Sequence, residues 1–256
     1  MLVATVTMQR SGSKLLGSCF NQGTVVRSFG EVFNPDAANV LGSFTQFVES
    51  RDRGFRKRGS DAVLDEYFQD FTMVHGIIHF DLMFNQAEIP CLSWNPYQDL
   101  FAYGYLKSRR AVVISLERES RDCYVSGQYL RCTGAKTAHY FTDANRAACA
   151  GRFVLDIKDY RSYCQTIARH RQRLYEAMSD YPYFIKCRYE DLAQRCRLPD
   201  ELVELIERSG KEHGIKVNKD LLQLLPPPIT PTSVNYRDVF ENFDELGSPG
   251  PMRATA

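Results

Sequence analysis

The feature that most constrains the fold is the order of local patterns along the chain, in which short apolar runs alternate with helix-like segments. The chain opens with Leu2–Met8, a run rich in Val and Thr of the kind found in buried strands. A small polar loop follows, and Lys14–Asn21 then repeats apolar residues at helical spacing. Ala111–Leu116 has the same apolar character as the opening run. This alternation predicts a parallel sheet covered by helices on both faces.

The remaining segments extend the pattern. Further strands are predicted at 25–29, 71–80 and 183–189, and helices at 60–70, 119–132, 156–179 and 199–209. We therefore expect an α/β fold with a central parallel sheet of about five strands and helices on both faces. The Pro-rich step at 225–228 breaks regular structure. Residues 1–225 are thus expected to form a single domain, and residues 226–256 a C-terminal tail that wraps around it or frays.

Composition excludes several classes of function. Lys and Arg total 32 against 31 Asp and Glu, so the net charge of +1 argues against a strongly basic nucleic-acid binder. No apolar run approaches the ~18 residues of a membrane helix, and the N-terminus lacks the pattern of a signal peptide. The eight cysteines contain no C-x-x-C pair and no zinc-type spacing. We expect a cytoplasmic protein with reduced thiols, no metal, and no nucleic-acid or membrane partner.

The loop after the first strand has the composition of an anion site. In a parallel sheet it lies at the carboxyl end of its strand, where ligands bind, and it leads into a helix N-terminus that favours an anion. The candidate residues are Arg10, Ser11, Gly12, Ser13, Lys14 and Leu15. The Walker spacing holds from Gly12 to Gly17, but Ser18 stands where the lysine should be. The alternative is a plain strand-to-helix turn with surface charges.

A second anion-binding pair is predicted after the strand at 111–116. Arg118 follows that strand at the ligand edge of the sheet, and Ser126 comes about two helical turns later. The planar fork of an arginine and a serine hydroxyl can together hold a phosphate. The alternative is that Arg118 and Arg121 pair with neighbouring carboxylates on a solvated face.

Together, an R-S-G-S loop after the first strand and an R-x(7)-S element after a central strand resemble the sulfotransferase superfamily, whose members transfer the sulfuryl group of 3′-phosphoadenosine 5′-phosphosulfate (PAPS). Segments 29–33 (FGEVF), 131–139 (containing RCTG and His139) and 189–192 (YEDL) resemble the bacterial branch that includes trehalose and nodulation-factor sulfotransferases. The resemblance spans about residues 2–192. It implies a P-loop-NTPase-like sheet within a sulfotransferase-like domain, and a homodimer by analogy.

The resemblance also implies roles for the candidate residues. The first loop, from Arg10 to Leu15, would hold the 5′-phosphosulfate of PAPS, and Arg118 with Ser126 would hold the 3′-phosphate that remains in the product PAP. Arg10 would also stabilise charge on the leaving group. The acceptor would be a hydroxyl (or amine) of a carbohydrate or small natural product, bound by loops within 35–58 and 86–108.

Two residues are candidates for the catalytic base. Glu31, within the 29–33 segment, is the base by resemblance to the bacterial branch. His79 falls near the end of the strand predicted at 71–80, roughly where animal cytosolic sulfotransferases carry a catalytic histidine. The ordinary pKa of histidine, ~6.5, also suits a base. The alternatives are that Glu31 is an ordinary loop carboxylate and that His79 is a structural histidine.

Two residues depart from the family pattern. Lys14 stands where the family usually has Thr or Ser, and Asp81 replaces a lysine in a segment similar to G-F-K-L-M-Y-D-Q. These departures leave open a nucleotide-binding protein that keeps the fold and has lost the chemistry. A P-loop small-molecule kinase, using ATP and Mg²⁺, is the enzyme alternative, weakened by the missing Walker lysine.

Overall fold

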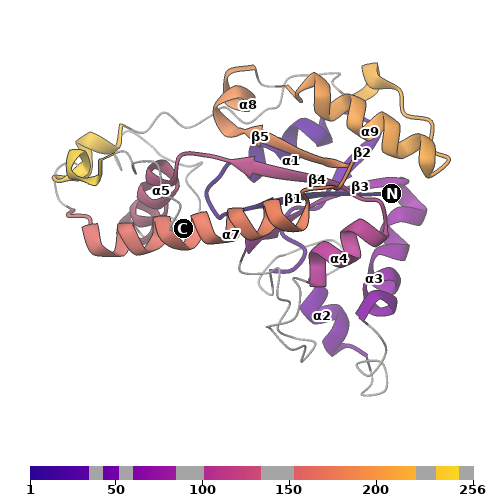
Figure 1. Cartoon of the computed structure of the whole chain (residues 1–256), viewed down its shortest axis with the longest axis horizontal. Helices are drawn as coiled ribbons and strands as arrows, with labels where there is room; N and C mark the ends of the chain where they lie inside the picture. Colours follow the sequence, from indigo (N-terminus) through magenta and orange to yellow (C-terminus); the bar gives the residue numbers. More distant parts are fainter. Residues whose placement is uncertain are drawn as a thin grey trace.

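A single parallel sheet forms the centre of the chain (Figure 1). The computed structural model describes residues 1–34, 43–51, 60–84, 101–133, 153–195, 197–222 and 235–247. The five strands are β1 (Leu2–Thr7), β2 (Val26–Ser28), β3 (Ile77–Met83), β4 (Val112–Glu117) and β5 (Phe184–Arg188). Their order is β2-β3-β1-β4-β5, and every neighbouring pair is parallel.

Helices cover both faces of this sheet, as Figure 1 shows. On one face pack α1 (Ser13–Asn21), α8 (Tyr189–Arg195) and α9 (Asp200–Glu212), followed by the short helix η4 (Lys219–Leu222). On the other pack α2 (Phe44–Glu49), α3 (Ser60–His75), α4 (Phe101–Ser108) and the C-terminal end of α7 (Ile157–Ala177). The predicted five-stranded α/β fold is confirmed, and the loop from the central strand β1 to α1 gives it the P-loop-like arrangement.

Alternate residues of β1 and β3 serve two separate cores. Leu2, Ala4 and Val6 face the core under α3 and α4, whereas Val3 faces the core under α1 and α9. Burial on both faces explains why the strands read as continuous apolar runs. The α1 side also carries buried polar residues, which are Thr5, Thr7, His79 and Asp81. Polar groups inside a sheet of this kind need partners, and they concentrate near the loop that follows β1.

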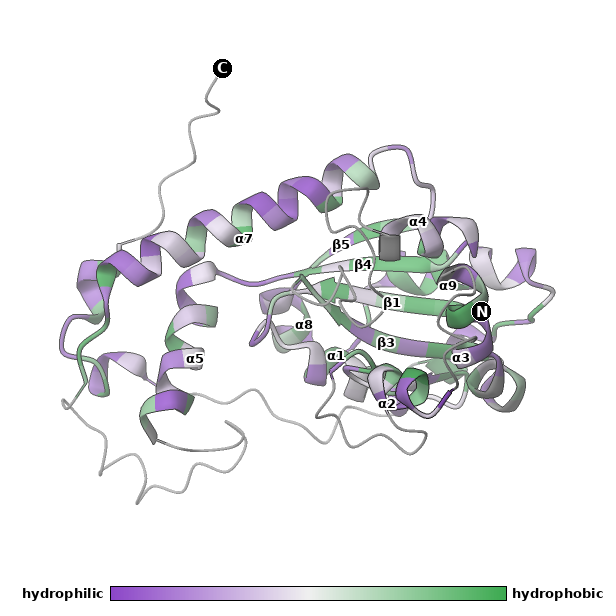
Figure 2. Ribbon diagram, turned by 90° about the horizontal axis from the view of Figure 1, so that it is seen from below, coloured by the Kyte–Doolittle hydropathy of each residue, from purple (hydrophilic) through white to green (hydrophobic). Residues whose placement is uncertain are grey.

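A third apolar cluster lies away from the sheet, where α5 (Ser120–Thr133) meets the first half of α7 and part of the tail. The tail contributes η5 (Tyr236–Asp238) and η6 (Phe243–Leu246). Asn242 fixes it to the segment before α7 by accepting from the Leu155 amide at 2.8 Å and donating to the Leu155 carbonyl at 2.9 Å. Figure 2 shows this lobe beside the apolar strands, with α7 running from one to the other.

The segment predicted as a strand at 71–80 is half helix. Helix α3 continues to His75 and ends at Gly76, whose φ of 69° is readily adopted by glycine. Strand β3 then begins at Ile77, so His79 is its third residue and does not lie at its end. Helices α2, α4 and α8 were not predicted, whereas the other predicted elements are found within a few residues of their expected bounds. Among the described residues, no helix is long and apolar enough to span a membrane.

Candidate functional site

The loop after β1 is a tight turn held by its own hydroxyls. Arg10 and Gly12 both have positive φ, of 70° and 96°. The Thr7 hydroxyl donates to the Ser11 hydroxyl at 2.5 Å, which donates to the Met8 carbonyl at 2.6 Å. Ser11 is 2% exposed, so its hydroxyl shapes the loop. Leu15 is buried in the core under α1, so its side chain likewise anchors the helix.

Gly12 is required by its neighbour as well as by its backbone. A Cβ built on Gly12 would lie 2.2 Å from Cδ2 of Tyr189, the first residue of α8. Gly12 occupies the position before α1, and it makes no side-chain capping hydrogen bond there. The first turn of α1 therefore presents amide groups without a side-chain cap, which favours an anion at this point.

Arg118 reaches this loop from the end of β4. Its Nη1 donates to the Arg10 carbonyl at 3.0 Å, and its guanidinium lies 4.4 Å from the ring centroid of Tyr189. Arg171 of α7 holds the Arg118 backbone by donating to its carbonyl at 2.8 Å. The Nε atom of Arg118 is buried and has no hydrogen-bond partner. A buried N–H without a partner is unfavourable and would gain from an anionic ligand.

Ser126 completes this cluster from α5. Its side chain is 3% exposed and accepts from Nε of Arg10 at 3.2 Å. The two predicted anion-binding motifs therefore meet in space. Burial lowers the pKa of the Arg10 guanidinium, and the charge of Arg118 lowers it further. Within the described residues neither arginine has a carboxylate within 4.0 Å. The alternative that Arg118 and Arg121 pair with neighbouring carboxylates therefore holds only for Arg121, which lies 3.7 Å from Asp122.

Glu31 lies on the other side of the loop, in the segment after β2. Gly30 positions this segment, with φ 66° and a carbonyl that accepts from the Asp81 amide at 2.8 Å. The Glu31 carboxylate accepts from the Asn34 side chain at 3.3 Å. Its charge raises the pKa of both Arg10 and Asp81. The carboxylate thus acts electrostatically on both the loop and β3.

His79 is fully buried, with 0% exposure. One ring nitrogen, Nε2, lies 2.7 Å from the Thr5 hydroxyl, and the other, Nδ1, lies 2.7 Å from the Ser28 hydroxyl. Burial lowers the pKa of the imidazole to about 3. Both nitrogens are occupied by core hydroxyls, and no exposed surface remains through which an acceptor could reach the ring.

Asp81 is the residue whose importance the sequence did not reveal. Its side chain is buried, and the side chain of Ser13, the first residue of α1, lowers the pKa of its carboxyl. Its Oδ1 atom is buried without a hydrogen bond. Burial raises the pKa of Asp81 to about 7, which the Ser13 contact and the charge of Lys14 moderate and Glu31 reinforces. An acidic residue within a strand that is apolar except for His79 was the available signal.

Several residues of the predicted site lie outside the described residues, and Lys14 has no hydrogen-bond or ion-pair partner among the described ones. His139, the loop segments 35–42 and 52–59, and most of 86–108 lie outside, so the acceptor pocket is not described. Lys14 is exposed at the start of α1. In the described part of the chain, no group of three or more His, Cys, Asp or Glu side chains is arranged to hold a metal ion.

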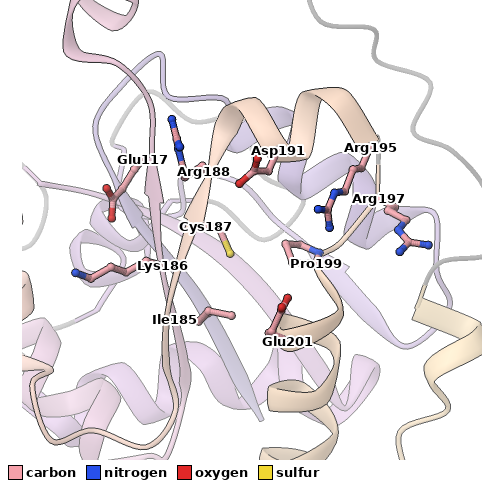
Figure 3. A pocket seen from close by; sticks show the side chains of 10 residues that line it. All are labelled: Glu117, Ile185, Lys186, Cys187, Arg188, Asp191, Arg195, Arg197, Pro199 and Glu201. Atoms are coloured by element: carbon pink, nitrogen blue, oxygen red, sulfur yellow. The ribbon is translucent and has the colours of Figure 1, made fainter.

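A second concave region lies beside the edge strand β5 (Figure 3). This β5 groove encloses about 540 Å³. Four basic and three acidic side chains line it, namely Lys186, Arg188, Arg195, Arg197, Glu117, Asp191 and Glu201. Within the described residues, the loop site and the β5 groove thus both gather basic side chains that could attract an anion.

Comparisons with known proteins give structural likenesses alone. No protein-family model and no curated protein matches the sequence. Among solved structures, the chain is similar to a sulfotransferase domain from the curacin biosynthetic pathway, with a TM-score of 0.42 and 13% identity over 95% of this chain and 85% of that one. It is also similar to a sulfotransferase domain from the Synechococcus PCC 7002 olefin synthase, with a TM-score of 0.39 and 13% identity over 96% and 82%. At these values the likenesses carry no inference about activity.

Proposed function

We propose that this protein is a PAPS-dependent sulfotransferase that moves a sulfuryl group to a hydroxyl (or amine) of a carbohydrate or small natural product. One observation carries the proposal. Arg118 and Ser126 are 108 and 116 residues from Arg10 in the sequence, yet both are hydrogen-bonded to it. PAPS has an anionic group at each end of its nucleoside, and two adjacent cationic subsites suit such a ligand.

The chemistry of the residues fits this donor. The uncapped start of α1, with Ser13 and Lys14, suits the phosphosulfate end. The buried, unpartnered Nε of Arg118 and the hydroxyl of Ser126 suit the 3′-phosphate end. Arg10 lies between them, so it would bridge the two subsites. No carboxylate of the described residues pairs with Arg10 or Arg118 within 4.0 Å, so a ligand would not have to displace an ion pair.

The proposed reaction is an in-line displacement at sulfur. The acceptor oxygen forms a bond to sulfur while the bond from sulfur to the bridging oxygen breaks, and the electron pair of that bond leaves with PAP. Arg10, Lys14 and the loop amides would stabilise the charge on the departing oxygen. The proton of the acceptor hydroxyl passes to the carboxylate of Glu31.

We propose Glu31, and not His79, as the base. Glu31 is half-buried in the segment facing the loop, whereas His79 is fully enclosed and bonded on both nitrogens. Glu31→Gln should therefore bind PAP as the wild type does and lose about 10²–10⁴-fold in transfer from labelled PAPS across an acceptor panel. His79→Asn should keep transfer within about tenfold when the variant is folded. The reverse pattern would assign the base to His79.

The binding test is calorimetric titration with PAP, with 5′-AMP and ATP plus Mg²⁺ as comparisons. We expect 5′-AMP to bind about 100-fold more weakly than PAP, because charge-assisted hydrogen bonds to the 3′-phosphate are each worth about 1.5–3 kcal/mol. Arg118→Met should remove most of this difference, and Ser126→Ala should weaken PAP binding by about tenfold.

Arg110→Met is a matched control, because Arg110 precedes the same strand at its opposite end and pairs with Glu212 at 3.1 Å. It should change PAP affinity less than about twofold. Preference for ATP with Mg²⁺ would instead indicate the kinase. Failure to bind either nucleotide would reject the sulfotransferase and leave a protein that retains only the fold.

A further inference from the structure

Asp81 lies beneath the anion end of the loop with an unusual set of contacts. It is 3% exposed, and its amide is fixed to the Gly30 carbonyl at 2.8 Å. The Ser13 side chain lowers the pKa of this carboxyl, and the Oδ1 atom of Asp81 lies 3.7 Å from Nε2 of His79. Its Oδ1 atom has no hydrogen bond. A buried carboxylate with one oxygen unpartnered is costly when ionised.

The charged groups around Asp81 do not neutralise it. From α1, Lys14 attracts a negative charge on Asp81, but the lysine is exposed. From the segment after β2, Glu31 repels it. On β3 itself His79 is kept neutral because burial lowers its pKa, and β1 places only Thr5 in register with Asp81. These opposing effects and the burial raise the pKa of Asp81 to about 7.

The hydroxyl of Ser13 can donate only one hydrogen. When Asp81 is ionised, it can only accept, so in a hydrogen bond between the two Ser13 is the donor. When Asp81 is protonated, its own O–H can donate to Ser13, and the Ser13 hydrogen is then released toward the loop. An anion bound at the start of α1 can accept that hydrogen. It also brings a second negative charge close to Asp81, and both effects favour the protonated acid.

We propose that Asp81 takes up a proton when the anionic end of the donor binds at the loop. Asp81 is thereby a proton-binding residue of the donor site, and its protonation leaves the Ser13 hydroxyl free to donate to the ligand. This inference rests on the proposed function, because it takes the 5′ end of PAPS or PAP as the anion. The family pattern has a lysine at this position, so this chain would differ from it in coupling donor binding to pH.

The test is calorimetric titration with PAP in HEPES and in Tris, two buffers with different enthalpies of ionisation. The dependence of the observed heat on the buffer gives the number of protons taken up per PAP bound. With a pKa of about 7 in the free protein, we expect about 0.5 proton at pH 7 and up to about 0.9 at pH 8. PAP affinity should then fall by up to about tenfold per pH unit above pH 7.5.

Three variants identify the group that takes the proton. Asp81→Asn should show almost no uptake and a nearly flat pH dependence above pH 7, while still binding PAP. Glu31→Gln should retain most of the uptake at pH 8. Asp180→Asn, which changes an exposed residue paired with Lys107, should behave as the wild type does. Uptake that persists in Asp81→Asn and vanishes in Glu31→Gln would overturn the proposal by moving the proton to Glu31.

A measurement on the wild type alone removes any dependence on how the variants fold. Infrared difference spectra with and without PAP at pH 8 should gain a band from a protonated carboxyl group. PAP binding without proton uptake or this band would reject the role of Asp81 and leave the proposed function intact. No PAP binding at all would reject the proposed function itself, and with it the role of Asp81.

Discussion

The loop site and the β5 groove both gather basic side chains, but they treat the charges differently. In the groove Arg188 lies 3.8 Å from Glu190, Arg197 lies 3.3 Å from Asp200, and Lys186 lies 3.6 Å from the Tyr175 ring centroid. The side chains of Arg188 and Arg197 are 66% and 54% exposed. At the loop site Arg10 and Arg118 are partly buried, and neither has a carboxylate partner within the described residues. Unpaired, partly dehydrated cations bind anions better than a larger number of neutralised ones.

The two regions also differ in shape. The groove is a wide space beside an edge strand, whereas the loop site is packed against the Tyr189 ring with no room for one more carbon on Gly12. Tight packing fixes the amides of the loop before any ligand arrives. Such preorganisation reduces the entropy lost on binding. The comparison therefore predicts that perturbations of the loop site are severe and perturbations of the groove are slight.

The largest effect is expected from Gly12→Ala. The new Cβ would meet the Tyr189 ring at 2.2 Å, and alanine is unfavourable at a φ of 96°. Strain and overpacking together should cost about 3 kcal/mol of unfolding free energy, measured by urea denaturation. PAP affinity of the folded variant should fall at least about 100-fold, because the amides that face the anion move.

Gly127→Ala is the matched control for that change. Gly127 lies within helix α5, and nothing lies within 4 Å of a Cβ built on it. Alanine in a helix interior should stabilise the protein by about 0.5–1 kcal/mol and leave PAP affinity unchanged. Similar losses for the two alanine variants would show that the loop is no more constrained than an ordinary helix.

This contrast marks how far the sequence could predict the site. Periodicity over a few residues was sufficient for the first strand and for the helices that carry the loop and Ser126. The loop itself was identified by its composition, and Ser126 by its spacing from Arg118 and by the family resemblance. The boundary at Gly76 was missed because the apolar residues from Phe71 to Phe80 form one run, in which helix and strand periods cannot be distinguished. The error placed His79 at the strand end, when it is enclosed between Thr5 and Ser28.

Contacts between distant elements were beyond reach for a different reason. The packing of Tyr189 on Gly12 joins α8 to the first loop, and the effect of Ser13 on the Asp81 carboxyl couples α1 to β3. Neither contact can be predicted from hydrophobic periodicity, because both depend on the order of the strands in the sheet and on how a helix packs against it. The Asp81 departure was visible, but its burial, which gives it chemical meaning, was not.

The next largest effect concerns pH, because the loop site buries titratable groups and the groove exposes them. Burial raises the pKa of Asp81 from 3.8 to about 7 and lowers that of His79 from 6.5 to about 3. Between about pH 4 and 7 the folded chain holds a proton on Asp81 that the unfolded chain has lost, so rising pH destabilises the fold. Between about pH 3 and 6.5 the unfolded chain holds a proton that folded His79 lacks, so falling pH destabilises it.

The two groups change the unfolding free energy with pH in opposite directions. Each contributes a slope of up to about 1.4 kcal/mol per pH unit. In the wild type they largely cancel between about pH 4 and 6.5. In Asp81→Asn the His79 slope remains, so unfolding free energy should rise with pH by about 1.4 kcal/mol per unit over this range. In His79→Asn it should fall with pH by a similar amount. Urea unfolding at pH 4.5, 5.5 and 6.5 measures both.

Glu201→Gln supplies the comparison from the groove. Glu201 is exposed at the start of α9, so its removal should leave the wild-type pH profile unchanged within about 0.5 kcal/mol. If Asp81→Asn and Glu201→Gln gave the same profile, the distinction between buried charges at the loop site and exposed charges in the groove would be wrong.

The smallest effect is expected where the two regions are most alike. Arg188 is the last residue of β5 and lies in register with Glu117, the last residue of the neighbouring strand β4. Arg118 follows Glu117 directly, so the two arginines lie at the carboxyl ends of neighbouring strands. Arg188→Met should change PAP affinity less than about twofold, because its charge is largely exposed and has a carboxylate at 3.8 Å. Arg118→Met, tested in the same titration, should lose about 100-fold. Equal losses would mean that PAP affinity depends only on the net positive charge at this end of the sheet. The expected difference would show that burial and the lack of a carboxylate partner decide which of two arginines on neighbouring strands binds PAP.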